Sequence, residues 1–125
     1  MEDYEVIISL ASNCQQEENL SEARKHLGQI LFDTRYTKAL WTKPITSNKQ
    51  SPLYLNQLVF ARTRLSTDLL INGLKDIEEQ MGRTAELRSK GIVPVDLDLM
   101  KHGDTLHHLN DWERPYIKAL LEEDV

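Results

Sequence analysis

Residues 53–82, LYLNQLVFARTRLSTDLLINGLKDIEEQMG, decide the fold. In residues 53–63 two sets of side chains alternate, and a period of two is typical of a strand with two usable faces. One set is Tyr54, Asn56, Leu58 and Phe60, and the other is Leu55, Gln57, Val59 and Ala61. Ser66 then offers an N-cap, Gly82 offers a stop, and the apolar positions between them recur at helical spacing. The stretch predicts a strand followed directly by an amphipathic helix.

Patterns on both sides of this unit predict the remaining elements. Alternating apolar residues predict a largely buried strand at 4–10, and helical spacing predicts a helix over 19–32. Further strands are expected at 34–41 and 93–100, a Pro-, Ser- and Thr-rich loop at 43–52, a polar loop at 84–92, and a short helix at 115–122 that begins with Pro. The order β-α-β-β-α-β predicts an α+β, ferredoxin-like fold, with one antiparallel sheet and both main helices on one face.

Length and composition favour one domain over residues 1–125, because 125 residues with 40% hydrophobic content suffice for one packed core. The single cysteine, Cys14, cannot form an intramolecular disulfide. The acidic start lacks the pattern of an export signal, and no apolar run is long enough to span a membrane. We therefore expect a soluble, cytoplasmic protein.

The net charge of -5 gives no general attraction to a polyanion, so nucleic acid is not an expected partner. Positive charge is nevertheless concentrated at Arg83, Arg88 and Lys90, where a small anion could bind.

The sequence Asp96-Leu97-Asp98 places two carboxylates on one face of the predicted last strand, because neighbouring side chains alternate between faces. Mg²⁺ prefers oxygen ligands and retains several waters, so two carboxylates together with phosphate oxygens form a sufficient site. The alternative interpretation is an ordinary solvated strand face.

Four segments in order resemble the 6-hydroxymethyl-7,8-dihydropterin pyrophosphokinase family of folate biosynthesis: SLASN at 9–13, YLN at 54–56, IEEQMGR at 77–83 and VDLDLM at 95–100. The resemblance extends from about residue 6 to residue 120, and it implies the same ferredoxin-like fold. It also implies transfer of a pyrophosphoryl group from ATP to the hydroxymethyl group of a reduced pterin, with release of AMP. Asp96 and Asp98 would bind two Mg²⁺ ions, which align and neutralise the reacting phosphates.

The resemblance also implies a nucleotide site. Arg83 matches an arginine that contacts the triphosphate, for which a guanidinium fork is suited. Glu78, His108 and Arg114 match positions near the nucleotide. Without the family, Arg83 and Glu78 are solvated helix residues, and His108 is a structural histidine.

For the pterin, the matching positions are Asn13, Thr42, Tyr54, Asn56 and Tyr116. Tyr116 stands where a phenylalanine usually stacks on the flat ring, and stacking requires only an aromatic face. Asn56 would pair with the aminopyrimidinone edge. The alternatives are sheet packing for Tyr54 and a turn role for Asn13.

The chain departs from the family in the segment before the aspartates. A second arginine, a tryptophan and a third arginine are usual there, and this chain has Ala85, Lys90 and Val93. Arg88 and Lys90 are candidates to replace the missing charge. We expect residues 84–92 to form a mobile lid that nucleotide orders. The family's common C-terminal extension is expected to be absent.

Three interpretations therefore stay open. The first is a compact pyrophosphokinase with ATP and a reduced pterin as its small-molecule partners, no membrane partner, and a monomeric or weakly dimeric state. The second is a non-catalytic relative that binds a pterin or a nucleotide without turnover. The third is a ferredoxin-like regulatory module.

Overall fold

The strand and helix predicted at 53–82 are both present, as β4 (Tyr54–Thr63) and α2 (Thr67–Gln80). The computed structural model describes residues 2–44 and 52–122. The Ser66 hydroxyl caps α2 by accepting a hydrogen bond from the Leu69 amide at 3.4 Å. Gly82 follows the helix at φ +90°, a left-handed conformation that glycine adopts without strain.

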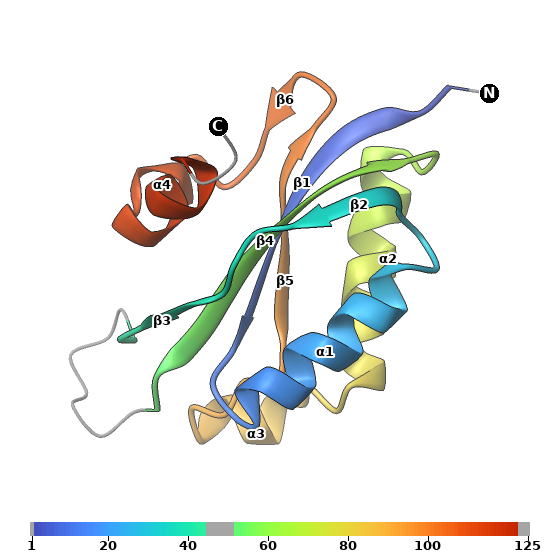
Figure 1. The fold of residues 1–125 in the computed structure, drawn as a ribbon. Helices are drawn as coiled ribbons and strands as arrows, with labels where there is room; N and C mark the ends of the chain where they lie inside the picture. The colour runs from blue at the N-terminus through green and yellow to red at the C-terminus, as the bar shows by residue number, and fades with distance from the viewer. Residues whose placement is uncertain (1, 45–51, 123–125) are drawn as a thin grey trace.

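The other elements complete one antiparallel sheet with flanking helices (Figure 1). They are β1 (Tyr4–Ser12), α1 (Gln16–Leu27), β2 (Phe32–Tyr36), β3 (Leu40–Thr42), α3 (Ala85–Ser89), β5 (Asp96–His102), β6 (Thr105–Leu106), the 3-10 helix η1 (Asp111–Glu113) and α4 (Pro115–Glu122).

The sheet has the strand order β2-β4-β1-β5-β6, and β3 also pairs with β4. Taken together, β2 and β3 occupy the place of the second strand in a βαββαβ unit. Figure 1 shows α1 and α2 on the same face of the sheet, as predicted, and α4 on the opposite face. The α+β, ferredoxin-like prediction is confirmed.

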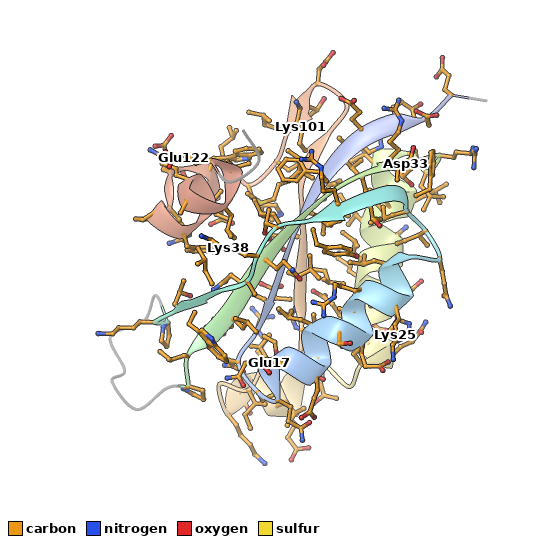
Figure 2. All side chains as sticks on the ribbon, viewed as in Figure 1. Glu17, Lys25, Asp33, Lys38, Lys101 and Glu122 are labelled. Atoms are coloured by element: carbon orange, nitrogen blue, oxygen red, sulfur yellow. The ribbon has the colours of Figure 1, made fainter. Side chains whose placement is uncertain are left out.

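Each face of β4 packs in an apolar cluster of its own. Val59 of β4 packs in the larger cluster with Leu27 of α1 and Leu74 of α2. Leu58, on the other face of β4, packs with Ile117 and with other residues of the α4 side. The exposed side of α1 carries charged residues such as Glu17 and Lys25 (Figure 2).

Several predicted boundaries in the first half of the chain are wrong. The strand predicted at 4–10 runs on to Ser12. The helix predicted at 19–32 begins at Gln16 and ends at Leu27, although Ile30 and Leu31 still pack against the core from the turn that follows. Because both side chains pack on the core, the apolar residues continue at helical spacing in the sequence, although this part of the chain is not a helix. The strand predicted at 34–41 is interrupted at Thr37, whose hydroxyl accepts the Leu58 amide hydrogen at 3.1 Å.

In the second half, the segment predicted as a polar loop at 84–92 contains α3, so that prediction is wrong in part. The Thr84 hydroxyl caps α3 by accepting from the Leu87 amide at 3.1 Å. The strand predicted at 93–100 begins later, at Asp96, and runs on to His102. The short strand β6 was not predicted, and the prediction for α4 is confirmed.

Residues 45–51 of the predicted loop lie outside the described residues. Within the described part of the chain, no helix is both long and apolar enough to cross a membrane.

Candidate functional site

Asp96 and Asp98 lie on the sheet face opposite α1 and α2. Between them, Leu97 enters the large core cluster on the helix side, so the two carboxylates point the other way. Strand register places Asp96 in the same cross-strand row as Asn56, because Ala11 of β1 pairs with both residues. The Asp96 and Asp98 side chains are 38% and 32% exposed, so solvent reaches both.

Asp98 has the most perturbed carboxyl of this face. Burial, and after it the charge of Asp96, raise its pKa to about 6, against a smaller lowering effect of His108. Two carboxylates held close together repel each other, which favours the protonated form of Asp98. A divalent cation would reverse this preference.

Arg83 joins α2 to the first aspartate. Its Nη1 donates to Glu78 Oε2 at 2.8 Å and to Asp96 Oδ1 at 2.9 Å. The same Glu78 oxygen accepts from the Leu97 amide at 2.7 Å, which fixes the end of α2 against β5. Burial lowers the pKa of Arg83, but its hydrogen bond and ion pair with Asp96 offset this effect, and the net change is a rise. Burial also raises the pKa of Glu78.

The predicted roles of these residues toward nucleotide stay predictions. In this structure Arg83 and Glu78 bind protein partners. Arg83 is half of an ion pair with a candidate metal ligand, and it would have to exchange Asp96 for phosphate in order to reach a nucleotide.

The predicted pterin residues gather beside Asp96. Asn56 is buried, and its Nδ2 donates to Thr42 Oγ1 at 2.7 Å and to the Leu40 carbonyl at 3.2 Å. Tyr54 pairs with Thr42 across β3 and β4, and burial together with the charge of Asp96 raises the pKa of Tyr54. The structure therefore brings Thr42, Tyr54 and Asn56 to one end of the candidate site.

Asn13 is also buried, and it anchors the segment before β5. Its Nδ2 donates to the Gly91 carbonyl at 2.7 Å, and its Oδ1 accepts from the Val93 amide at 2.6 Å. The turn interpretation left open for Asn13 underestimated this role, because the partners are about 80 residues away in the sequence. Contact with a pterin stays a prediction.

The segment before α4 forms a second wall of the candidate site, in addition to the wall formed by Thr42, Tyr54 and Asn56. His108 lies between two carboxylates, with its Nε2 3.8 Å from Asp98 Oδ1 and its Nδ1 3.9 Å from Asp111 Oδ2. Arg114 Nε donates to Asp111 Oδ1 at 2.9 Å. Burial raises the pKa of Tyr116, and the charge of Asp111 adds to this rise. Asp111 was not among the predicted site residues; its spacing of three residues from both His108 and Arg114 was the available signal.

Two predicted residues are not brought to the aspartates by any described contact. Arg88 and Lys90 are exposed on α3 and directly after it, and Lys90 Nζ forms an ion pair with Glu86 at 3.4 Å. Their predicted role as replacement charge stays a prediction.

The donor set fits Mg²⁺ bound together with a phosphate ligand. Among the described residues no group of three or more His, Cys, Asp or Glu side chains is arranged to hold a metal ion. Asp96 and Asp98 alone supply two oxygen ligands on one strand face. A hard cation that takes the rest of its shell from water and phosphate suits such a pair, whereas a metal that needs a complete protein cage does not.

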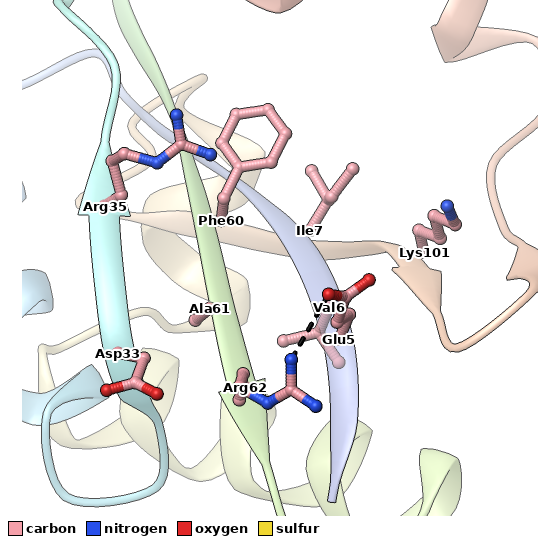
Figure 3. Close-up of a pocket in the computed structure, with 9 residues that line it drawn as sticks. All are labelled: Glu5, Val6, Ile7, Asp33, Arg35, Phe60, Ala61, Arg62 and Lys101. Atoms are coloured by element: carbon pink, nitrogen blue, oxygen red, sulfur yellow. Dashed lines mark hydrogen bonds and ion pairs between the residues drawn. The ribbon is translucent and has the colours of Figure 1, made fainter. Parts of the chain in front are cut away.

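A separate hollow of about 380 Å³ lies on the same sheet face, toward the β2 end (Figure 3). Ile7, Phe60 and Lys101 line it together with Arg62, which is paired with Glu5 at 3.2 Å. It contains none of the predicted site residues.

Comparison with known proteins identifies the same family that the sequence resembles. The family model described as 7,8-dihydro-6-hydroxymethylpterin-pyrophosphokinase (HPPK) matches residues 7–123. Over 130 residues the chain is 36% identical to the mitochondrial folate synthesis bifunctional protein of Pisum sativum. The aligned region covers 96% of this chain and 25% of that protein. It is 32% identical over 127 residues to a folate synthesis bifunctional protein of Arabidopsis thaliana, covering 94% of this chain and 26% of the relative.

A folate synthesis bifunctional protein of Chlamydia trachomatis is 33% identical over 95 residues, which is 68% of this chain and 21% of that protein. The chain spans about a quarter of the length of the two plant relatives.

Proposed function

The chain belongs to the 7,8-dihydro-6-hydroxymethylpterin-pyrophosphokinase family, and on that premise we propose that it transfers a pyrophosphoryl group from ATP to 6-hydroxymethyl-7,8-dihydropterin in folate biosynthesis, releasing AMP. One observation carries the proposal. Asp96 and Asp98 lie on one half-buried strand face, in register with Asn56 on one side and within 3.8 Å of His108 on the other.

In the proposed reaction the hydroxymethyl oxygen of the pterin attacks the β-phosphorus of ATP. The bond from that phosphorus to the oxygen bridging to the α-phosphate breaks, AMP leaves with that oxygen, and the hydroxyl proton is released. Phosphoryl transfer of this kind depends mainly on positioning and charge stabilisation. Mg²⁺, when bound, supplies charge neutralisation and alignment of the phosphates.

The chain's own residues would divide this work between them. Asp96 and Asp98 would hold the metal. Arg83 remains tethered through Glu78 when it releases Asp96, because the two contacts use separate partner oxygens, and its guanidinium would then reach phosphate oxygens.

Asn56 is suited to the aminopyrimidinone edge of the pterin. Its Nδ2 is committed to Thr42 and Leu40, and among the described residues no donor is bonded to its Oδ1. The ring edge presents N–H donors, so a fixed amide oxygen would recognise it. Tyr54 of β4 and Tyr116 of α4 supply aromatic faces, and stacking on one of them would orient the ring.

A second candidate is a non-catalytic relative that binds pterin or nucleotide. It is favoured by Ala85, Lys90 and Val93, which stand where the family usually has arginine, tryptophan and arginine. The Val93 amide bonds to Asn13, so this position contributes backbone rather than charge.

The test is AMP formation from ATP, Mg²⁺ and 6-hydroxymethyl-7,8-dihydropterin, with Asp96→Asn as the inactive variant. Asp104→Asn removes the same charge from the exposed turn between β5 and β6 and serves as the matched control. We expect pterin-dependent AMP from wild type and from the control only. Binding of both ligands without AMP would favour the second candidate, and binding of neither would favour the regulatory module.

We further propose a monomer or weak homodimer, a cytoplasmic location, and no nucleic acid or membrane partner. The net charge of -5 supports the exclusion of nucleic acid. Gel filtration at two protein concentrations tests the oligomeric state.

A further inference from the structure

Asp111 occupies the centre of the wall formed by the segment before α4. It begins η1, and its amide donates to the His108 carbonyl at 2.8 Å. Its two carboxylate oxygens face different partners: Oδ1 accepts from Arg114 Nε at 2.9 Å, and Oδ2 lies 3.9 Å from His108 Nδ1. One carboxylate thus contacts both residues that were predicted to face the nucleotide on this wall.

The backbone beside Asp111 is held in an uncommon conformation. His108 has φ +52°, which non-glycine residues rarely adopt, and such strain persists only where neighbouring contacts enforce it. The enforcing contacts flank it: the His107 amide donates to the Met100 carbonyl at 2.9 Å, and Trp112 Nε1 donates to the His107 carbonyl at 2.9 Å. The strained turn places the His108 ring between Asp98 and Asp111.

The hydrogen bond from Arg114 to Asp111 leaves the two terminal guanidinium nitrogens available for a ligand. Asp111 engages Nε, and among the described residues neither Nη1 nor Nη2 has a hydrogen-bond partner. A guanidinium fixed through Nε retains two terminal nitrogens for phosphate oxygens, without a search through rotamers at the moment of binding.

We infer that Asp111 is a positioning residue of the nucleotide site, which holds Arg114 and His108 in place so that Arg114 presents its terminal nitrogens to a phosphate group. The inference rests on the proposed function and adds to it a residue that no family match supplied. A carboxylate near a triphosphate repels it, so Asp111 strengthens binding only by orienting the groups that attract the phosphates.

The experiment measures the Kd of α,β-methylene-ATP with Mg²⁺ by titration calorimetry. This analogue cannot break the bond that the proposed reaction cleaves. The proteins are wild type, Asp111→Ala, Asp111→Asn, Arg114→Ala and the double variant Asp111→Ala/Arg114→Ala. Glu113→Gln is the matched control, because it removes one charge from the same turn, and the ion pair of the Glu113 side chain among the described residues is with Lys118, at 3.0 Å.

We expect Asp111→Ala to weaken binding about tenfold, as for loss of a hydrogen bond to a charged group. Asp111→Asn retains an acceptor for Arg114 and should weaken it less, and Glu113→Gln should leave the Kd within about twofold. In the Arg114→Ala background, Asp111→Ala should change the Kd by less than about threefold, because the effects of two substitutions that remove the same contact do not add. If Asp111→Ala does not fold by circular dichroism, the comparison rests on Asp111→Asn against Glu113→Gln.

Unchanged or tighter binding by the Asp111 variants overturns the inference and leaves the proposed function standing. Equal losses from Asp111→Ala in the wild-type and Arg114→Ala backgrounds also overturn it, because Asp111 would then act independently of Arg114. Failure of wild type to bind the analogue overturns both the inference and the proposed function.

Discussion

Replacing Asp98 by Asn should make the metal-free protein more stable above pH 6 and abolish its response to Mg²⁺ and nucleotide. The folded state raises the pKa of Asp98 from 3.8 to about 6, through burial first and the charge of Asp96 second. Between these two pH values the unfolded chain loses the proton and the folded chain keeps it. Stability therefore falls as the pH rises through this window, and the full cost of the charged form is present above pH 6.

The size of this effect follows from the same pKa. Each tenfold change in proton affinity is worth about 1.4 kcal/mol, so ionised Asp98 costs the folded state up to about 3 kcal/mol. The side chain is 32% exposed, and solvent screening reduces the effective cost to about 1–2 kcal/mol. Asn carries no charge, so the variant should exceed wild type by that amount at pH 8 and match it near pH 4. For a chain of 125 residues this corresponds to a rise in Tm of about 4–8 °C.

Thermal unfolding in EDTA at pH 4, 6 and 8 measures the first effect, and Asp104→Asn is the control for loss of a surface charge. Repeating the scan with Mg²⁺ and α,β-methylene-ATP measures the second effect, because ligand that binds only the folded state raises Tm. Wild type should gain stability and Asp98→Asn should not. An equal ligand-induced rise in Tm for both proteins would refute the assignment of Asp98 as a metal ligand.

Three further predictions concern the helix cap, the anchor of the segment before β5, and the lid. Ser66→Ala should lower the free energy of unfolding by about 1 kcal/mol in urea titrations, because it removes the side-chain acceptor at the start of α2, and no measurable loss would contradict the cap. Asn13→Ala should cost about 2 kcal/mol and speed amide exchange at Val93, since two part-buried hydrogen bonds are lost; exchange at wild-type rates would argue against the anchor. The amides of residues 84–92 should exchange quickly without ligand, because α3 has no buried residue, and slowly with Mg²⁺ and the ATP analogue; unchanged exchange would exclude a lid.

The fold was predictable because its central unit carries strong local signals. Alternation in β4 and the cap, stripe and stop of α2 are local patterns, and both elements formed where expected. The errors arose where tertiary contacts decide the outcome. Ile30 and Leu31 extended the predicted helix too far, because they pack on the core from a turn. The predicted strand is broken at Thr37, because its hydroxyl bonds to the Leu58 amide of the neighbouring strand.

The candidate site was predictable to the level of a shared face, because strand periodicity alone places Asp96 and Asp98 together. The partners of each side chain were not predictable from spacing. Glu78 bonds to the Leu97 amide, 19 residues away, and Asn13 bonds to Val93, 80 residues away. Asp111 was missed because an acidic residue in a polar segment looks solvated, and its role depends on the turn that brings it to His108.

The most direct measurement of the proposed function is a ³¹P NMR spectrum of the protein incubated with ATP, Mg²⁺ and 6-hydroxymethyl-7,8-dihydropterin. It distinguishes transfer of a pyrophosphoryl group from hydrolysis and from binding alone, because AMP, ADP, inorganic phosphate and a diphosphate ester give separate signals. The proposed function predicts AMP and a pterin diphosphate in equal amounts, with neither formed when the pterin is omitted. Appearance of ADP and inorganic phosphate instead, or unchanged ATP in a sample that binds both substrates, would contradict it.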